Sequence, residues 1–148
     1  MKNVFGSIDR LMSGLYKDYL QFFKYMGVGV LGTLADWATF YILIGFADVY
    51  YLYAVALSYA VGTVINFFLN KRFTFKNTYK KIHFQFLSFA LVALIGLGLN
   101  EALLYAFVHY VFASSSDIAL MASRVIVTFI VFVWNFVANK RTTFKIFQ

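Results

Sequence analysis

Two short segments of the sequence combine amide and cationic side chains at a fixed spacing. Residues 66–76 read N-F-F-L-N-K-R-F-T-F-K and residues 135–145 read N-F-V-A-N-K-R-T-T-F-K, with eight of eleven positions identical. We call them the first and second motif. In each, two asparagines stand four residues apart and therefore share one face of a helix, and a lysine and an arginine follow directly. An anionic headgroup would find both charge and hydrogen-bond partners there.

The two motifs supply eight candidate residues for binding an anionic lipid headgroup: Asn66, Asn70, Lys71, Arg72, Asn135, Asn139, Lys140 and Arg141. The cations complement a helix end beside lipid phosphates, but they would also stand there if they only fixed the orientation of the chain. Neither helix needs an amide one turn before its end. Asn66 and Asn135 are therefore explained either by a polar contact between helices or by a ligand, and the sequence leaves both explanations open.

A second set of polar residues interrupts the apolar parts of the chain: Asp36, Asn100, Glu101 and Arg124. At helical rise, Asp36, Glu101 and Arg124 each lie about 21 to 23 Å from the basic end of their own segment, and hence at one depth. A central membrane charge costs roughly 2.5 to 3.5 kcal/mol, which favours pairing. We predict an intramembrane polar cluster that either locks helix packing or leaves one carboxylate free to titrate.

Four apolar runs must position these residues: 22–46, 52–69, 84–111 and 118–138. Each is long enough to cross about 30 Å of hydrocarbon at 1.5 Å per residue. The chain has 148 residues, of which 62% are hydrophobic and 13% charged, a balance far more apolar than that of soluble domains. The sequence therefore predicts an all-α integral membrane protein with four transmembrane helices.

The first twenty residues have a different pattern. Apolar residues recur at steps of three and four between charged ones, as in Val4, Ile8, Leu11, Leu15 and Tyr19. This predicts an amphipathic interfacial helix over residues 1–20, with a frayed tail as the alternative. The first apolar run follows a long polar stretch and no cleavage site precedes it, so we interpret it as a retained membrane anchor.

The basic residues predict the orientation. Twelve of the thirteen would lie on one side of the membrane: before or at the start of the first run, between the second and third, or after the fourth. The other two connections, 47–51 and 113–117, have none, and Arg124 lies inside the fourth run. The positive-inside rule places both termini in the cytoplasm.

Composition also excludes several functions. A net charge of +7 would suggest nucleic-acid binding if the basic residues lay on the surface of a soluble fold. The long apolar runs argue against such a fold. Cysteine is absent, and His83 and His109 are far apart in sequence, so we expect neither a metal nor a cofactor. No nucleophile, base and orienting group come together, and we do not expect an enzyme.

The two motifs belong to a longer internal repeat. Upstream pairs stand at one constant offset: Gln21 and Gln85, Gly32 and Gly96, Ala38 and Ala102, Tyr41 and Tyr105. We predict a single domain over 1–148, with two tandem helical hairpins at 21–76 and 84–145. Because each hairpin crosses twice, the copies are parallel and bring both motifs to the cytoplasmic face.

These residues resemble the GtrA-like family of four-helix membrane proteins of cell-surface polysaccharide synthesis. The resemblance covers residues 22–144 and rests on F-F-K-Y-M-G-V-G-V-L-G-T-L-A-D at 22–36 and on the two motifs. It implies translocation of a polyprenyl-phosphate sugar, such as undecaprenyl phosphate-glucose, to the outer leaflet of a bacterial or archaeal plasma membrane for polysaccharide, teichoic acid or O-antigen glycosylation. It also implies a polyprenyl-phosphate glycosyltransferase as partner. Asn100 and Glu101 replace the lone acid of the first repeat, which argues against a symmetric mechanism.

The sequence leaves two alternatives to translocation. One is a scaffold that recruits or orients a glycosyltransferase, and the other is a small-molecule exporter driven by a membrane carboxylate. The one-sided charge and the doubled motif count against the exporter. Four helices enclose little space, which favours a dimer or larger homo-oligomer.

Overall fold

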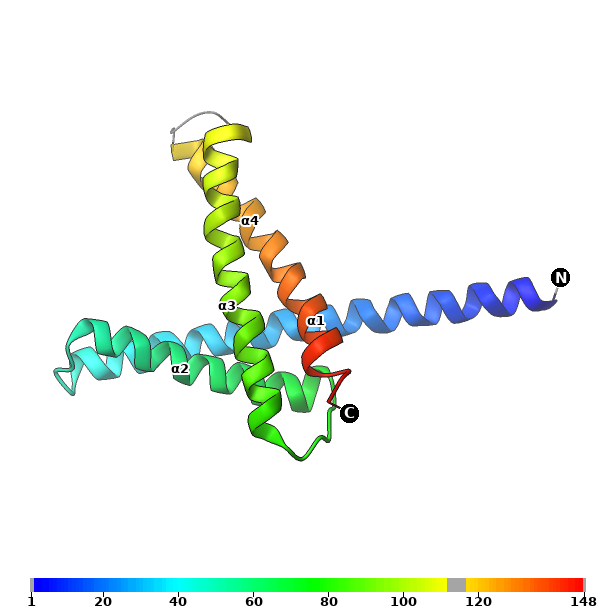
Figure 1. Cartoon of the computed structure of the whole chain (residues 1–148), viewed down its shortest axis with the longest axis horizontal. Coiled ribbons are helices and arrows are strands. Elements are labelled where there is room, and N and C mark those ends of the chain that lie inside the picture. Colours follow the sequence, from blue (N-terminus) through cyan, green and yellow to red (C-terminus); the bar gives the residue numbers. More distant parts are fainter. Residues whose placement is uncertain (1, 112–116, 148) are drawn as a thin grey trace. The chain divides into compact units, whose positions relative to one another are not determined.

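The computed structural model describes residues 2–111 and 117–147, and the side chains of residues 12–111 and 118–147. Within that part the chain is helical and contains no strand (Figure 1). Its elements in chain order are α1 (Lys2–Gly45), α2 (Tyr51–Leu69), η1 (Asn70–Thr74), α3 (Ile82–Ala106), η2 (Phe107–Val111), α4 (Asp117–Ala138) and η3 (Asn139–Thr143). The three elements labelled η are short π-helical turns.

Four helical segments are long and apolar enough to span a bilayer: Met12–Gly45, Tyr51–Thr74, Ile82–Val111 and Ile118–Thr143. They leave large apolar side chains exposed, including Trp37 at 67%, Phe46 at 77% and Ile118 at 82%. In water such a surface would drive association, whereas in lipid it is the surface a span requires. The predicted all-α protein with four transmembrane helices is confirmed.

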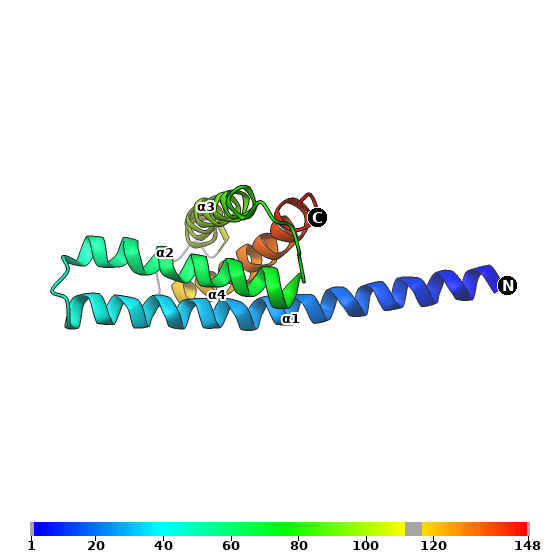
Figure 2. The same ribbon diagram turned by 90° about the horizontal axis from the view of Figure 1, so that it is seen from below.

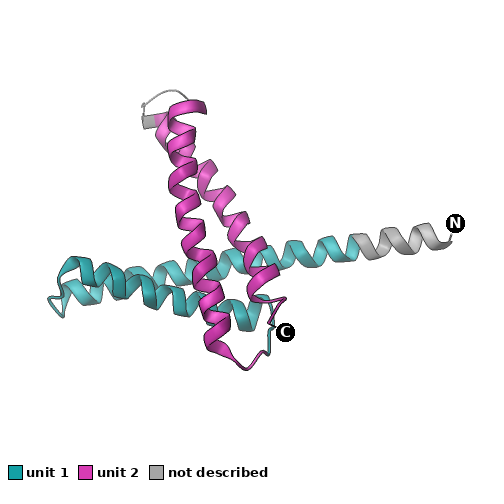
Figure 3. Ribbon diagram, in the orientation of Figure 1, with its two compact units in different colours: residues 1–78 teal, residues 79–148 magenta. Residues whose placement is uncertain are grey.

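The chain divides into two compact units, Met1–Thr78 and Tyr79–Gln148, which we call the first and second hairpin (Figure 3). In the first, α1 and α2 run antiparallel and side by side (Figures 1 and 2). Their turn is closed by the Val49 N–H, which donates to the Leu43 carbonyl at 3.0 Å. Asp48 has a φ of 49°, a left-handed backbone that short polar residues tolerate. In the second hairpin, α3 packs against α4.

Helix α1 begins well before the first apolar run. The predicted interfacial segment 1–20 is helical from Lys2 onward, and the helix continues without a break to Gly45. The chain contains no proline, and nothing else in this stretch breaks a helix. The predicted stripe of Val4, Ile8 and Leu11 lies outside the described side chains, and the interfacial position of the segment stays a prediction.

Close contact between α1 and α2 depends on a glycine. A Cβ atom added to Gly62 would lie 2.9 Å from the Asp36 Cβ and 2.9 Å from the Gly32 carbonyl oxygen. One of these neighbours is backbone and cannot move aside. Ala54 and Ser58 precede Gly62 at four-residue steps and are also buried. This face of small residues lets the two helix backbones approach closely.

Candidate functional site

Both motifs leave the α-helix at their second asparagine. The turns η1 and η3 begin at Asn70 and Asn139 and end at a threonine. The N–H of Phe75 donates to the Asn70 carbonyl and that of Phe144 to the Asn139 carbonyl, both at 2.9 Å and both five residues back. A π-helical turn of this kind is wider than an α-helical one and frequently marks a functional site. In both motifs it turns the second asparagine into the hairpin, where it is buried.

The first asparagine of each motif lies against a glycine of the partner helix in its own hairpin. A Cβ atom on Gly32 would overlap the carboxamide of Asn66. A Cβ atom on Gly96 would overlap the Oδ1 of Asn135 and lie 3.0 Å from its Nδ2. Both asparagines therefore pack against the neighbouring helix of their hairpin, and the choice between a polar helix contact and a ligand stays open. In both, the Oδ1 atom is buried without a hydrogen-bond partner.

A pair of aromatic rings has the same place in both hairpins. Tyr25 and Phe75 have ring centroids 6.2 Å apart at 67°, and Phe89 and Phe144 have centroids 6.3 Å apart at 65°. These are edge-to-face contacts of the favoured geometry. The same register therefore joins the first helix of each hairpin to the end of its motif.

In the second hairpin, hydrogen bonds close this end. Gln85 Nε2 donates to the Thr143 carbonyl at 3.1 Å, and the hydroxyls of Ser88 and Thr143 are 3.1 Å apart. Thr143 Oγ1 in turn donates to Asn139 Oδ1 at 2.9 Å. Gln85, Thr143 and Asn139 are fully buried. The buried side chains of Asn139 and Thr143 thus find partners within the hairpin, which avoids the free-energy cost of an unsatisfied buried polar group.

The first hairpin lacks the equivalent bonds. Asn70 and Thr74 are also buried, with 2% and 3% of their surface exposed, but Asn70 Oδ1 and Thr74 Oγ1 have no hydrogen-bond partner. The residue that corresponds to Ser88 at the constant offset is Lys24, which is exposed. The hydroxyl that binds the threonine in the second hairpin is therefore replaced by an ammonium group on a long stem.

Several motif cations have partners within the chain. Lys71 Nζ donates to Asn77 Oδ1 at 3.0 Å. The Arg72 guanidinium lies 5.7 Å from the centre of the Phe73 ring, and Lys140 Nζ lies 5.8 Å from that of Phe136. These cation–π contacts orient the two side chains along the helix ends.

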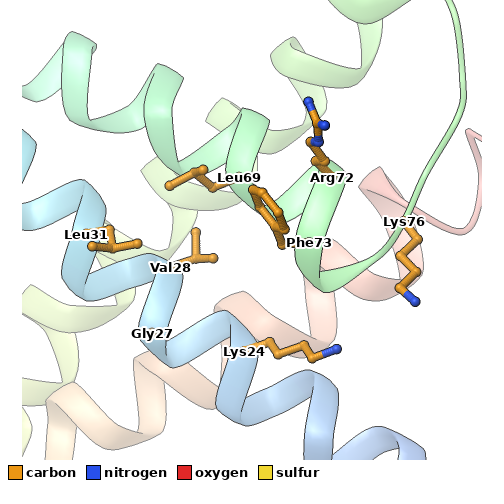
Figure 4. A pocket seen from close by; sticks show the side chains of 8 residues that line it. All are labelled: Lys24, Gly27, Val28, Leu31, Leu69, Arg72, Phe73 and Lys76. Atoms are coloured by element: carbon orange, nitrogen blue, oxygen red, sulfur yellow. The ribbon is translucent and has the colours of Figure 1, made fainter.

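An open groove of about 520 Å³ lies between α1 and the end of α2 in the first hairpin (Figure 4). We call it the Lys24 groove. Its lining residues are Lys24, Gly27, Val28, Leu31, Leu69, Arg72, Phe73 and Lys76. The ammonium groups of Lys24 and Lys76 point toward the same side, whereas the Arg72 guanidinium points away from them (Figure 4).

Lys24 and Lys76 are not among the eight site residues predicted from the sequence. Each was counted only as a basic residue near a membrane surface. The one available signal was the fixed offset, which pairs Lys24 with a serine and so marks it as a departure between the repeats. Of the eight predicted residues, the groove includes Arg72.

The predicted intramembrane polar residues are divided between the hairpins: Asp36 lies in the first, and Asn100, Glu101 and Arg124 lie in the second. Asp36 is half-buried in the first hairpin, close to Gly62. In the second, Asn100 Nδ2 donates to Glu101 Oε1 at 3.3 Å, and Glu101 and Arg124 are both exposed. Among the described side chains of this hairpin, no ion pair joins those two. A cluster that also includes Asp36 stays a prediction.

These features define a class: a multi-pass helical membrane protein whose two hairpins each end in a basic, asparagine-containing π-helical turn. Residues 24–144 match the family described as "GtrA/DPMS, transmembrane domain", and the chain belongs to this family. The predicted GtrA-like membership is confirmed. No curated protein and no solved structure matches the chain. The family associates the protein with processes that involve polyprenyl-phosphate sugars.

Proposed function

We propose that the protein moves a polyprenyl-phosphate-linked sugar, such as undecaprenyl phosphate-glucose, from the cytoplasmic to the outer leaflet of a bacterial or archaeal plasma membrane. Family membership supports the substrate class. The observation that carries the proposal is the Lys24 groove, where ammonium groups border an apolar wall. A lipid phosphate needs both the ammonium groups, for its phosphate, and the apolar wall, for its hydrocarbon chain. A soluble anion needs only the ammonium groups.

The orientation follows from the charge distribution. Both motifs and both termini lie in the cytoplasm under the positive-inside rule, so the basic ends face the leaflet in which the lipid is loaded with sugar. The headgroup then crosses past the intramembrane residues Asp36, Asn100, Glu101 and Arg124 while the prenyl chain stays in lipid. No covalent step is involved, so the protein acts as a transporter and not as an enzyme.

Reconstituted vesicles test this proposal. A radiolabelled polyprenyl-phosphate sugar is placed in the inner leaflet, and its arrival outside is measured by a membrane-impermeant reagent with and without the protein. We expect the protein alone to accelerate exposure, and replacement of Asn66 by alanine to abolish the acceleration while insertion persists. Unchanged rates with wild-type protein would refute translocation.

One observation favours a second candidate, a scaffold that recruits or orients a polyprenyl-phosphate glycosyltransferase. The span Met12–Gly45 has 34 residues, or about 51 Å of helix, more than the roughly 30 Å of hydrocarbon requires. The excess helix offers a binding surface at the membrane boundary. A scaffold would retain the transferase during purification yet leave the exposure rate in vesicles unchanged.

A further inference from the structure

We infer that the two hairpins differ in role: the lipid phosphate binds in the first hairpin between Lys24 and Lys76, and the second hairpin is a closed structural counterpart. This assignment rests on the proposed function, because it takes the ligand to be a phosphorylated prenyl lipid. It adds two binding residues to the eight predicted from the sequence: Lys24, which lies outside the motifs, and Lys76, the last residue of the first motif.

The chemistry of the Lys24 groove selects this ligand. Two ammonium groups on one side of the groove match an anionic phosphate, and each supplies up to three donors to its oxygens (Figure 4). The wall is apolar, with Val28 buried, and with Leu31 and Phe73 more than half exposed. Exposed apolar side chains beside a charged end suit a hydrocarbon chain that continues from the phosphate.

The corresponding positions of the second hairpin do not reproduce this surface. At the two constant offsets of the repeat, Lys24 corresponds to Ser88, Gly27 to Leu91, and Phe73 to Thr142. Ser88 carries no charge, unlike Lys24, and its hydroxyl is within hydrogen-bond distance of the Thr143 hydroxyl. Leucine in place of Gly27 adds a side chain where the groove has only backbone. One motif thus accompanies an open cationic groove and the other a closed hydrogen-bonded end.

The buried acceptors of the first hairpin agree with this division. Asn70 Oδ1 and Thr74 Oγ1 have no partner, although their counterparts in the second hairpin do. Buried polar atoms without partners are uncommon, and each requires a reason. A lysine kept at position 24 for an anion, in place of a serine that would bind the threonine, is such a reason.

The backbone at Lys76 is a further sign of selection for the side chain. Its φ of 49° is left-handed, a conformation that glycine adopts without cost at a helix end. Among the described residues, the one other non-glycine residue with a positive φ is Asp48. Lys145, which corresponds to Lys76 in the second hairpin, does not have a positive φ. A lysine in a glycine-type position is explained if its ammonium group binds the phosphate in the groove that it lines.

The experiment measures binding of undecaprenyl phosphate to the full-length protein in lipid nanodiscs. We compare the wild type with Lys24→Ser, which installs the residue of the second hairpin, and with Lys76→Gly, which suits the left-handed backbone. Lys145→Gly removes the corresponding charge of the second hairpin and is the matched control. Thermal melting checks that every variant is folded, and inorganic phosphate serves as competitor.

We expect each first-hairpin variant to weaken binding by at least about tenfold, the usual effect of losing a charged hydrogen bond. Lys145→Gly should change it less than about threefold, and millimolar phosphate should not compete. Equal losses in both hairpins, no saturable binding to the wild type, or effective competition by phosphate would each overturn the assignment.

The exposure assay in vesicles separates this inference from the proposed function. If equal losses occur and the wild type still accelerates exposure, translocation stands and the division between hairpins is wrong. If the first-hairpin variants alone lose binding and the wild type never accelerates exposure, the binding site stands and translocation is wrong.

Discussion

The two hairpins carry nearly the same motif, and their ends share several structural features. Both place the first asparagine on a glycine, both pair the same two aromatic positions, and both finish in a π-helical turn. They differ where Lys24 stands in one and Ser88 in the other. The serine contributes to a closed hydrogen-bond network, whereas the lysine lines an open groove.

This difference indicates that two copies of a motif can have different roles in one protein. An unsatisfied buried polar group costs about 1 to 3 kcal/mol, so the first hairpin gives up stability that the second retains. Natural proteins tolerate such costs mainly at functional sites. Three substitutions test whether the two hairpins differ in this way.

The largest effect is expected from Gly62→Val, which places at Gly62 the residue found at the corresponding position 131. Because a Cβ atom there would meet the Asp36 Cβ and the Gly32 carbonyl at 2.9 Å, the helices must separate. We expect a loss of about 3 kcal/mol, measured by thermal or denaturant unfolding in detergent. Gly98→Ala is the control, since nothing lies within 4 Å of a Cβ atom there. Equal stability of the two variants would contradict the close approach of α1 and α2.

A smaller loss is expected from Gln85→Leu in the second hairpin. This substitution leaves the buried Thr143 carbonyl without the donor it has at 3.1 Å, at a cost of about 2 kcal/mol. The matched variant is Gln21→Leu in the first hairpin, where the glutamine is half-buried, and we expect less than about 1 kcal/mol there. Unfolding in the same detergent measures both. If Gln21→Leu costs as much, the hairpins are closed alike.

The smallest effect on stability, and one of opposite sign, is expected from Lys24→Ser. A serine at this position can bind Thr74 as Ser88 binds Thr143, which satisfies a buried hydroxyl and stabilises the protein by about 1 kcal/mol. The same variant should lose lipid affinity, so stability and function change in opposite directions. The melting midpoint and the binding constant are measured on one preparation. A destabilised variant would show that the lysine itself holds the first hairpin together.

Much of the fold could be predicted because membrane spans depend on composition summed over a segment. The runs ending at Leu69 and Ala138 were placed from apolar length alone, and the structure ends α2 and α4 at those residues. The start of α1 could not be placed in the same way. A change from mixed to apolar composition near residue 20 marks a change of environment, but a helix backbone continues through it unless a residue breaks it.

For the candidate site, the sequence by itself determined the residue types, the doubled motif and the family. The contacts between helices came from the structure: Asn66 lies against Gly32, Gln85 binds the Thr143 carbonyl, and Lys24 and Lys76 line one groove. The physical reason is distance along the chain. Apolar length is a local property, whereas the Gln85–Thr143 bond joins residues 58 positions apart and depends on which faces of two helices come into register.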